Sequence, residues 1–309
     1  MSQAWVIKIL ETPEEIALVE ELQRRIWPGS ETDIVPVHML LASVHNGGLL
    51  IGAYAEERLV GFVFGFPAIY FTPDGPRLKH HSHMLGVDAD FRNQGMGFGL
   101  KRAQWQMIRH QGVDRITWTY DPLLGINAKL NITKLGAVCN TYLENYYGEL
   151  RDGLNTGLPS DRFQVDWWVN SRRVNRRLSR RVRRPLDLNH YLMAGAQVIN
   201  SVQVNQEGLV IPSDTGMSNS SSLAGEHALS DIATADESDA SDAMLLVEIP
   251  YNFSKLKFSS PSAAAEWRHH TRQIFSDLFA KGYLITDFIA QPGDPARSYY
   301  VLSYGESTL

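Results

Sequence analysis

The most informative stretch of this chain runs from His81 to Leu100 and reads His-Ser-His-Met-Leu-Gly-Val-Asp-Ala-Asp-Phe-Arg-Asn-Gln-Gly-Met-Gly-Phe-Gly-Leu. The residues from His80 to Val87 are typical of a β-strand, and those from Phe98 to Gln111 have the apolar spacing of a helix. Between them, Gly95 and Gly97 let the backbone approach a ligand without interference from a Cβ atom. The helix directs its free N–H groups and the positive end of its dipole into this turn. The stretch therefore predicts a pyrophosphate site at a strand–turn–helix junction.

Three phosphate-binding motifs compete for this turn. A P-loop needs Gly-Lys-Ser/Thr, whereas Lys101 stands between a leucine and an arginine. A dinucleotide fingerprint needs Gly-x-Gly-x-x-Gly at the start of a β-α-β unit, and Gly95, Gly97 and Gly99 lack that spacing. The remaining pattern is Arg-x-x-Gly-x-Gly, formed by Arg92 with the first two of these glycines. A tight glycine turn that binds nothing is the structural alternative.

Strands and helices alternate along the first 170 residues. Thr12 and Glu15 predict a capping box at the start of a helix over 13–27. Asn46-Gly47-Gly48 closes a second helix, and Gly136 ends the last one. The expected strands are 5–10, 49–55, 59–71, 80–87, 115–120, 138–146 and 162–169, and the expected helices are 13–27, 36–45, 98–111 and 126–135. This alternation predicts a mixed α/β (α+β) domain.

The pattern from Arg92 to Gly97 resembles the central motif of the GNAT superfamily of acyl-CoA N-acyltransferases, Arg/Gln-x-x-Gly-x-Gly/Ala between a strand and a helix. The residues from Asn127 to Gly136 are similar to the superfamily's Asn-containing helix that ends in Leu-Gly. The resemblance covers roughly Trp5 to Val169. It implies a twisted mixed sheet flanked by helices, with acetyl-CoA or another acyl-CoA as co-substrate and no metal.

The resemblance also implies which residues bind and react. It assigns coenzyme binding to Leu85, Val87, Arg92, Asn93, Gln94, Gly95, Met96, Gly97 and Asn127. Backbone N–H groups near Leu85 and Val87 would polarise the thioester carbonyl and hold the developing oxyanion. The acceptor amine attacks the thioester directly, so no covalent enzyme intermediate is implied.

His81 and His83 are the candidate bases that take a proton from the amine. Two residues apart in a strand, their side chains are expected on one face, together with those of Leu85 and Val87. His-x-His-x-Leu-x-Val is similar to arylalkylamine N-acetyltransferases, in which paired histidines relay the amine proton. Two alternatives stay open: half-buried histidines bonded to backbone or water, and a zinc pair, for which no third ligand is fixed nearby by the sequence.

One position departs from the superfamily pattern. Its members often place a tyrosine, which reprotonates the leaving thiolate, four residues before the glycine that ends the helix. Here that position is Ile132. Either another tyrosine serves, among Tyr142, Tyr146 and Tyr147, or the thiolate leaves unassisted. A non-catalytic module that binds acyl-CoA or a partner protein therefore stays open beside the transferase.

Substrate clues are fewer. Arg162 could bind a substrate carboxylate in a bidentate manner, or pair with Asp161 or Asp166. The resemblance implies an acetyl or succinyl donor and a small amine or amino acid as acceptor.

An arginine-rich connector is expected over 171–185, with Val174, Leu178 and Val182 on one helical stripe. Its eight arginines are either solvated or an anion-binding surface. Residues 186–309 form a smaller C-terminal α+β portion with a mobile acidic segment at 212–243. Its order of strand, helix, glycine and two strands echoes that of residues 115–169, which suggests a degenerate half-unit; a small α+β cap is the alternative. The expected domains are thus 1–170, 171–185 and 186–309.

The composition bounds the remaining choices. The 309 residues carry a formal net charge of −5, which disfavours a nucleic-acid partner. A single cysteine, Cys139, fits a reducing compartment, and no apolar run reaches the length of a membrane helix. We expect a cytoplasmic enzyme with a small-molecule partner. The oligomeric state, a homodimer included, is left open.

Overall fold

The computed structural model describes residues 4–29, 31–148, 158–179, 186–213 and 244–305. The chain forms two compact units. Unit 1 comprises Met1–Trp118, Leu150–Thr156 and Asp166–Leu178, and unit 2 comprises Thr119–Glu149, Gly157–Val165 and Ser179–Leu309. Each unit is made of several segments of the chain. The division of the sequence at residues 170 and 185 stays a prediction.

Unit 1 is built on a sheet with the strand order β1-β2-β3-β4-β5. The first four strands pair in antiparallel fashion, and β4 and β5 pair in parallel. The strands are β1 (Val6–Ile9), β2 (Leu49–Ala55), β3 (Arg58–Thr72), β4 (Gly75–Val87) and the first part of β5 (Arg115–Tyr120), and the last part of β7 (Arg162–Trp168) also belongs to the unit. The helices are α1 (Pro13–Ile26), η1 (Glu31–Asp33), α2 (Val37–His45), η2 (Ala89–Phe91), α3 (Met96–His110) and α5 (Arg172–Leu178).

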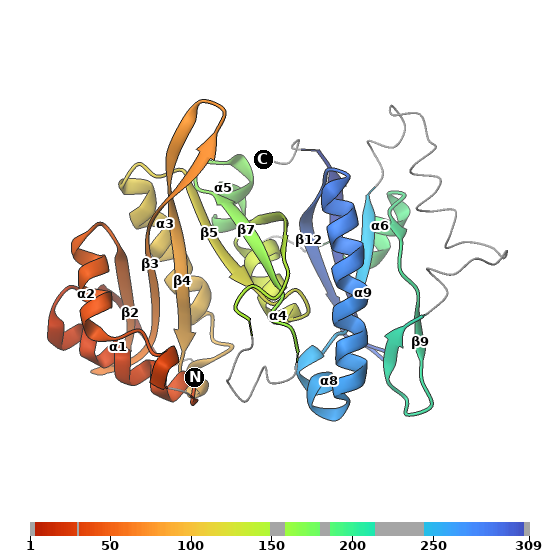
Figure 1. The fold of residues 1–309 in the computed structure, drawn as a ribbon, viewed down its shortest axis with the longest axis horizontal. Coiled ribbons are helices and arrows are strands. Elements are labelled where there is room, and N and C mark those ends of the chain that lie inside the picture. The colour runs from red at the N-terminus through yellow and green to blue at the C-terminus, as the bar shows by residue number, and fades with distance from the viewer. Residues whose placement is uncertain (1–3, 30, 149–157, 180–185, 214–243, 306–309) are drawn as a thin grey trace. The chain divides into compact units, whose positions relative to one another are not determined.

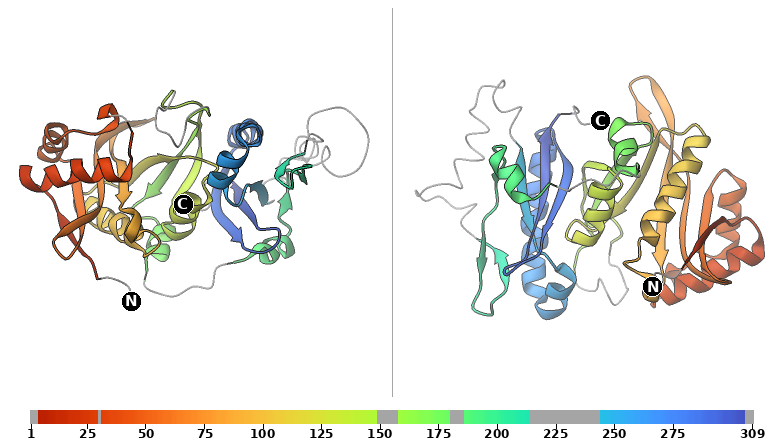
Figure 2. Two further views of the ribbon diagram at one scale, coloured as in Figure 1. Left: turned by 90° about the horizontal axis from the view of Figure 1, so that it is seen from below. Right: turned by 180° about the vertical axis from the view of Figure 1, so that it is seen from behind.

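Local sequence signals explain where these helices begin. The expected capping box of α1 is confirmed: Thr12 Oγ1 accepts from the Glu15 amide at 3.3 Å, and the Glu15 carboxylate accepts from the Thr12 amide at 3.3 Å. The apolar side of α1 packs with α2 against β2 and β3 in one buried cluster that includes Ile16, Leu40 and Phe62. Figures 1 and 2 show the α1/α2 pair and α3 on opposite sides of this sheet.

The inner face of α3 is partly polar. Its aliphatic members Leu100 and Ile108 are buried, whereas Ala103 and Met107 are only half-buried. The other side chains that α3 buries are Met96, Lys101, Gln104 and Trp105. Hydropathy alone does not predict that Lys101 and Gln104, two polar side chains, are buried.

Unit 2 carries the remaining strands and helices. Its strands are β6 (Val138–Leu143), β8 (Gln197–Val198), β9 (Val202–Val204), β10 (Val210–Pro212), β11 (Leu245–Ile249), β12 (Tyr283–Gln291) and β13 (Arg297–Tyr304), together with the ends of β5 and β7. Its helices are α4 (Gly125–Ala128), which continues into the π-helical turn η3 (Lys129–Lys134), α6 (Leu188–Met193), α8 (Phe253–Ser259) and α9 (Pro261–Ala280). The mixed α/β class and the C-terminal α+β composition are thereby confirmed.

Strand order in unit 2 bears on the suggested half-unit. Along one sheet β7 lies between β5 and β6, and β13 lies between β12 and β11. In both cases the last strand of the sequence lies between the first two. The C-terminal elements therefore share this strand order with residues 115–169, which supports the half-unit hypothesis. The structure adds α6, α8 and the β9–β10 hairpin to the elements expected from the sequence.

Several expectations fall on residues that are not described. Val182 and the arginines at 180, 181, 183 and 184 lie outside the described residues, as does 214–243 of the expected mobile segment. Within α5, Val174 and Leu178 are buried, as the apolar stripe predicts. In the part of the chain that the structure describes, no helix is long and apolar enough to cross a membrane.

Candidate functional site

The site in unit 1 is organised by an irregularity in β4. On the first part of the strand Gly65 of β3 pairs with Ser82, and on the last part Phe64 pairs with Met84. His83 is therefore an extra residue in β4, a β-bulge. Such a bulge reverses the alternation of the strand, because residues on its two sides differ by one in register.

The bulge determines which way the β4 amides point. The Asp88 N–H donates to the Val60 carbonyl of β3 at 2.8 Å, so it points toward β3. Because backbone groups alternate along a strand, the amides of Met84 and Gly86 also point toward β3. The N–H groups of Leu85 and Val87 then point to the other edge of β4.

The other edge of β4, which faces β5, is unpaired over the last part of the strand. β4 pairs with β5 only at His80–Ile116 and His81–Thr117, although β4 continues to Val87. The two strands therefore separate after His81. The Leu85 and Val87 amides are donors on an edge of the sheet that no described strand covers.

The turn after β4 is fixed by polar contacts. Asp88 accepts from Arg58 at 2.6 Å, and its carboxylate also accepts from the Asp90 amide. Arg92 Nε donates to the Val87 carbonyl at 3.0 Å, which ties the first residue of the motif to the end of the strand. Gln94 donates to the Asp90 carbonyl at 3.0 Å.

Two residues of the turn adopt left-handed backbone conformations. Asn93 has φ = 62°, which asparagine tolerates better than most residues, and Gly95 has φ = +83°. Gly95 is the N-cap of α3, and a Cβ atom added to it would meet nothing within 4 Å. Its hydrogen atom therefore faces open space.

The first turn of α3 supplies further donors. The Gly99 N–H is accepted by the Gly95 carbonyl at 3.0 Å, so the amides of Met96, Gly97 and Phe98 precede the first intrahelical bond. Met96 as a whole residue is buried, whereas Gly97 and Phe98 are half-buried. Gly99 serves packing instead, because a Cβ atom there would overlap the Trp5 indole.

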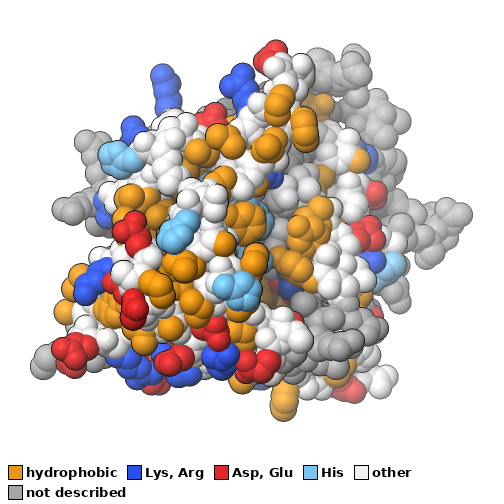
Figure 3. Space-filling view, turned by 60° about the vertical axis from the view of Figure 1, so that its left-hand side comes forward, with side chains coloured by type: hydrophobic (Ala, Val, Ile, Leu, Met, Phe, Trp, Pro, Cys, Tyr) orange, Lys and Arg blue, Asp and Glu red, His pale blue; other side chains and the backbone are white. Residues whose placement is uncertain are grey.

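The two candidate bases lie together on the α1/α2 side of the sheet. Their ring centroids are 6.0 Å apart, and the Phe66 ring lies 5.4 Å from His81 and 5.7 Å from His83. Burial, and next the charge of His83, lower the pKa of His81 to about 4. Burial of the ring also lowers the pKa of His83, although the residue as a whole is exposed. Both imidazoles are therefore neutral at pH 7. Figure 3 shows histidine side chains among hydrophobic ones on one face of the molecule.

One expectation about this strand is wrong. Leu85 and Val87 were expected to share a face with the two histidines, but the bulge at His83 reverses the order. Met84 packs in the α1/α2 cluster, and a Cβ atom on Gly86 would meet Ile26 and Trp27 of that same side. The side chains of Leu85 and Val87 therefore point to the α3 side, while their amides point to the open edge.

The remaining candidate residues belong to unit 2. Asn127 is a half-buried residue of α4. Arg162 donates to the Asp161 carbonyl at 2.9 Å and stacks on Tyr147, whereas the carboxylates of Asp161 and Asp166 pair with Arg272 and Arg115. Both carboxylates that the sequence offered as partners of Arg162 thus have another arginine as a partner.

The structure shows the surroundings of Ile132, which stands where the acid tyrosine was expected, and of the three other tyrosines considered for that role. Ile132 is fully buried in η3, where it contributes to the core. Tyr142 donates to Asp161 at 2.7 Å, whereas Tyr146 and Tyr147 are largely exposed. Burial, and next the bond to Asp161, raise the pKa of Tyr142 well above its usual value.

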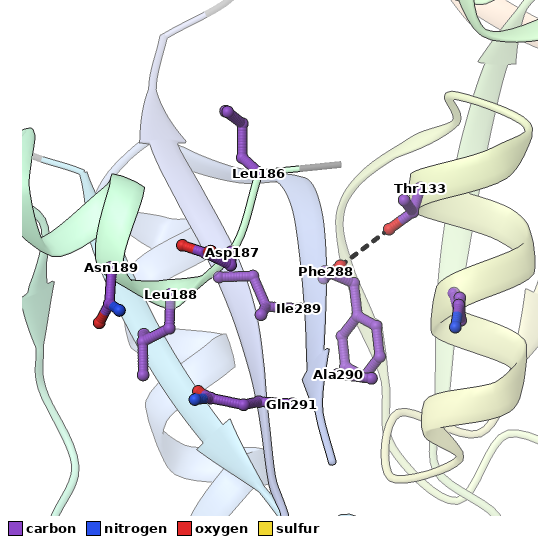
Figure 4. Close-up of a pocket in the computed structure, with 10 residues that line it drawn as sticks. Thr133, Leu186, Asp187, Leu188, Asn189, Phe288, Ile289, Ala290 and Gln291 are labelled. Atoms are coloured by element: carbon purple, nitrogen blue, oxygen red, sulfur yellow. Dashed lines mark hydrogen bonds between the residues drawn. The ribbon is translucent and has the colours of Figure 1, made fainter. Parts of the chain in front are cut away.

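Unit 2 also contains an open pocket of about 360 Å³ between η3, the start of α6 and β12 (Figure 4). β12 has its own register shift at Thr286 and pairs with β6 only at Ile285–Cys139. Unlike the open edge of β4, this part of β12 has a partner, because Thr133 Oγ1 of η3 donates to the Phe288 carbonyl at 2.9 Å. Among the described residues, no group of three or more His, Cys, Asp or Glu side chains could hold a metal ion.

Comparisons with known proteins give structural likeness only. No protein-family model matches the sequence, and no curated protein matches it. Among solved structures, an aminoglycoside 6′-acetyltransferase type Ii is 18% identical, with 54% of this chain and 99% of that chain covered at a TM-score of 0.43. The ribosomal-protein-S18-alanine N-acetyltransferase from Escherichia coli is 15% identical, and the match covers 54% of this chain and 96% of that chain at a TM-score of 0.42. The IAA acetyltransferase from Bacillus cereus is 15% identical, and the match covers 53% of this chain and 99% of that chain at a TM-score of 0.39. These neighbours are acetyltransferases, and their identities and TM-scores are too low to indicate a function of this chain.

Proposed function

We propose that this chain is an acyl-CoA-dependent N-acyltransferase, which transfers an acetyl or succinyl group to the amine of a small molecule or amino acid. One observation carries the proposal: the bulge at His83 turns the Leu85 and Val87 amides to the open edge of β4. That edge leads directly into the glycine turn and the free amides that open α3. A carrier with a thioester at one end and a pyrophosphate at the other would find donors for both.

The pyrophosphate would be held by the backbone of the turn. Amides at the beginning of α3 combine hydrogen-bond donation with the positive end of the helix dipole. Gly95 leaves open space in front of them. The terminal nitrogens of Arg92 would add positive charge, while its Nε holds the Val87 carbonyl.

The acyl transfer would be a direct displacement. The amine nitrogen attacks the thioester carbonyl, the C–N bond forms, the C–S bond breaks, and coenzyme A leaves as the thiolate. The oxyanion that develops on the carbonyl would be stabilised by the Leu85 and Val87 amides, since fixed donors need no rearrangement during the reaction.

The amine loses a proton in this reaction, and His83 is the better placed base. Its ring is partly exposed, whereas His81 is more buried and has a pKa of about 4. A base of such low pKa takes a proton from an ammonium ion only weakly. His81 would then support His83, with which it shares the contact to Phe66.

Ile132 favours a second candidate, a module that binds acyl-CoA without turnover. This side chain carries no proton and is fully buried. The transferase remains preferred because a thiol has a pKa near 8.5, so its thiolate can leave without an acid.

The test combines binding and turnover. Thermal shift with acetyl-CoA and succinyl-CoA should show stabilisation, and thiol release against a panel of amines and amino acids should show turnover. Stabilisation without turnover on any amine favours the binding module, and no effect of either thioester refutes both. The variant with both His81→Ala and His83→Ala should bind coenzyme A normally but lose the low-pH limb of its pH–rate profile; an unchanged profile contradicts their role as bases.

A further inference from the structure

A lysine lies on the same face of β4 as the two candidate bases. Lys79 precedes His81 by two residues, and side chains two residues apart in a strand point to one side of the sheet. The bulge comes only after His81, so it does not change this relation. Besides burial and the charge of His83, the charge of Lys79 contributes to the lowered pKa of His81. The lysine and the histidines therefore belong to one electrostatic site.

The Lys79 amine has no anionic partner of its own. The residue is half-buried, and in the part of the chain that the structure describes no carboxylate forms an ion pair with it. Burial, and next the positive charge of Arg115, lower the pKa of Lys79, while the charge of Asp166 opposes them. An ammonium group that has lost part of its hydration without gaining a partner is stabilised when an anion reaches it.

The carboxylate that acts on Lys79 is already bonded to an arginine. Arg115 Nε donates to Asp166 Oδ1 at 2.8 Å, and Arg115 Nη2 lies 2.7 Å from the same oxygen. The Arg115 guanidinium carbon also lies 4.5 Å from the centroid of the Tyr70 ring and 5.1 Å from that of Trp168. Arg115 and Asp166 are thereby fixed as a pair, and the positive charge of Lys79 is left uncompensated.

The order of groups along β4 indicates which substrate would bring the anion. The Leu85 and Val87 amides, proposed to hold the thioester carbonyl, follow the histidines, whereas Lys79 precedes them. An amine that attacks this carbonyl and gives its proton to His83 has the thioester on one side. The rest of the acceptor then extends to the other side, toward His81 and Lys79. Two residues of a strand span about 7 Å, so an amine and a carboxylate of one small molecule can reach both places.

The facing strand leaves the path to Lys79 open. Ala68 of β3 is in register with Lys79, and Phe66 is in register with His81. Ala68 has a small, exposed side chain, whereas the Phe66 ring lies beside both histidines. An acceptor that extends along β4 would therefore meet an aromatic ring at the histidines and an accessible amine beyond them.

We propose that Lys79 binds a carboxylate of the acceptor, so that the enzyme selects acceptors that carry both an amine and a carboxylate. Its effect on rate rests on the proposed acyl transfer. Its effect on binding does not, because an acceptor can be titrated into the protein without any coenzyme.

The kinetic test compares α- and ω-amino acids with their own carboxamides, with acetyl-CoA as the donor. In the unsubstituted protein, kcat/KM should be higher for the carboxylates. Lys79→Met keeps a similar length and removes the charge. It should lower kcat/KM for the carboxylates about 10- to 100-fold, as expected for a charge-assisted hydrogen bond, and for the carboxamides less than about threefold. Lys79→Arg should keep most of the preference.

Arg77→Met is the matched control. Arg77 is an exposed residue two positions further from the histidines on the same face of β4, so its loss should leave the preference unchanged. Equal losses for carboxylates and carboxamides in Lys79→Met would report a general disturbance of the site and overturn the proposal. A loss that follows succinyl-CoA rather than the carboxylate of the acceptor places the anion on the acyl group and overturns it too.

Binding without coenzyme separates this proposal from the proposed function. The NMR signals of the His81 and His83 rings should shift when the amino acids are titrated into the unsubstituted protein. Lys79→Met should need at least about tenfold higher concentrations for the same shifts. If the protein neither binds nor turns over acyl-CoA, the proposed function fails, and these titrations still decide the role of Lys79. No shift with any carboxylate, or equal affinities in Lys79→Met, overturns the proposal.

Discussion

Gly95→Ala is the most informative change in the turn, because Gly112→Ala is a matched control at the other end of the same helix. The two glycines have φ = +83° and φ = +74°, and a Cβ atom on either would meet nothing within 4 Å. The left-handed conformation costs an L-residue roughly 1–2 kcal/mol. Both variants should therefore lose about the same free energy of unfolding.

Only Gly95 lies beside the amides proposed to bind the pyrophosphate. In Gly95→Ala the strain either remains or is relieved by rotating those amides, so binding can lose up to the same roughly 1–2 kcal/mol, about 5- to 30-fold in affinity. Gly112→Ala should bind as the unsubstituted protein does.

The assay is isothermal titration with coenzyme A, with urea unfolding of each variant to compare stabilities. Equal affinities for the two variants, at equal losses of stability, would refute the reasoning that the N-terminus of α3 is the pyrophosphate site. A loss of affinity in Gly112→Ala alone would place the site elsewhere.

Three further changes test other parts of the account. His83→Ala should lower kcat on the order of 10²-fold at pH 7, with partial recovery at higher pH. Because burial lowers the pKa of His83, the rate of the unsubstituted enzyme should fall only below pH 6.5. A pH–rate profile of the unsubstituted enzyme that is identical to that of the variant would contradict the role of His83 as the base. Gly99→Ala should lower the melting temperature by displacing Trp5 while the affinity for coenzyme A changes little; an unchanged melting temperature would contradict the packing seen. Asp121→Asn should cost about 3–5 kcal/mol in urea unfolding, because it leaves the buried Arg268 without its bidentate partner, and a cost below about 1 kcal/mol would contradict that pairing.

Much of the fold follows from local signals in the sequence. The capping residues of α1, the glycines after α2 and the alternating strands each act within a few residues, so their positions could be predicted. The π-helical turn at Lys129–Lys134 and the small β9–β10 hairpin could not, because neither leaves a distinct pattern in hydropathy.

In the candidate site, too, the features set by nearby residues could be predicted and those set by distant ones could not. The glycine turn and the two histidines were predictable, since motif and spacing lie in one short stretch. The bulge at His83 was not, because it arises from the pairing of β4 with Gly65 on another strand. A strict alternation therefore placed the Leu85 and Val87 side chains on the wrong face. Lys101 was missed for a related reason: a buried amine is stabilised by partners that only the folded chain brings together.

The most direct measurement is a crystal structure of the protein with acetyl-CoA. We expect the pyrophosphate oxygens within hydrogen-bond distance of the amides of Gly95–Phe98, and the thioester carbonyl at the amides of Leu85 and Val87. A carrier bound at another place, with this edge of β4 and this turn left free, would contradict it.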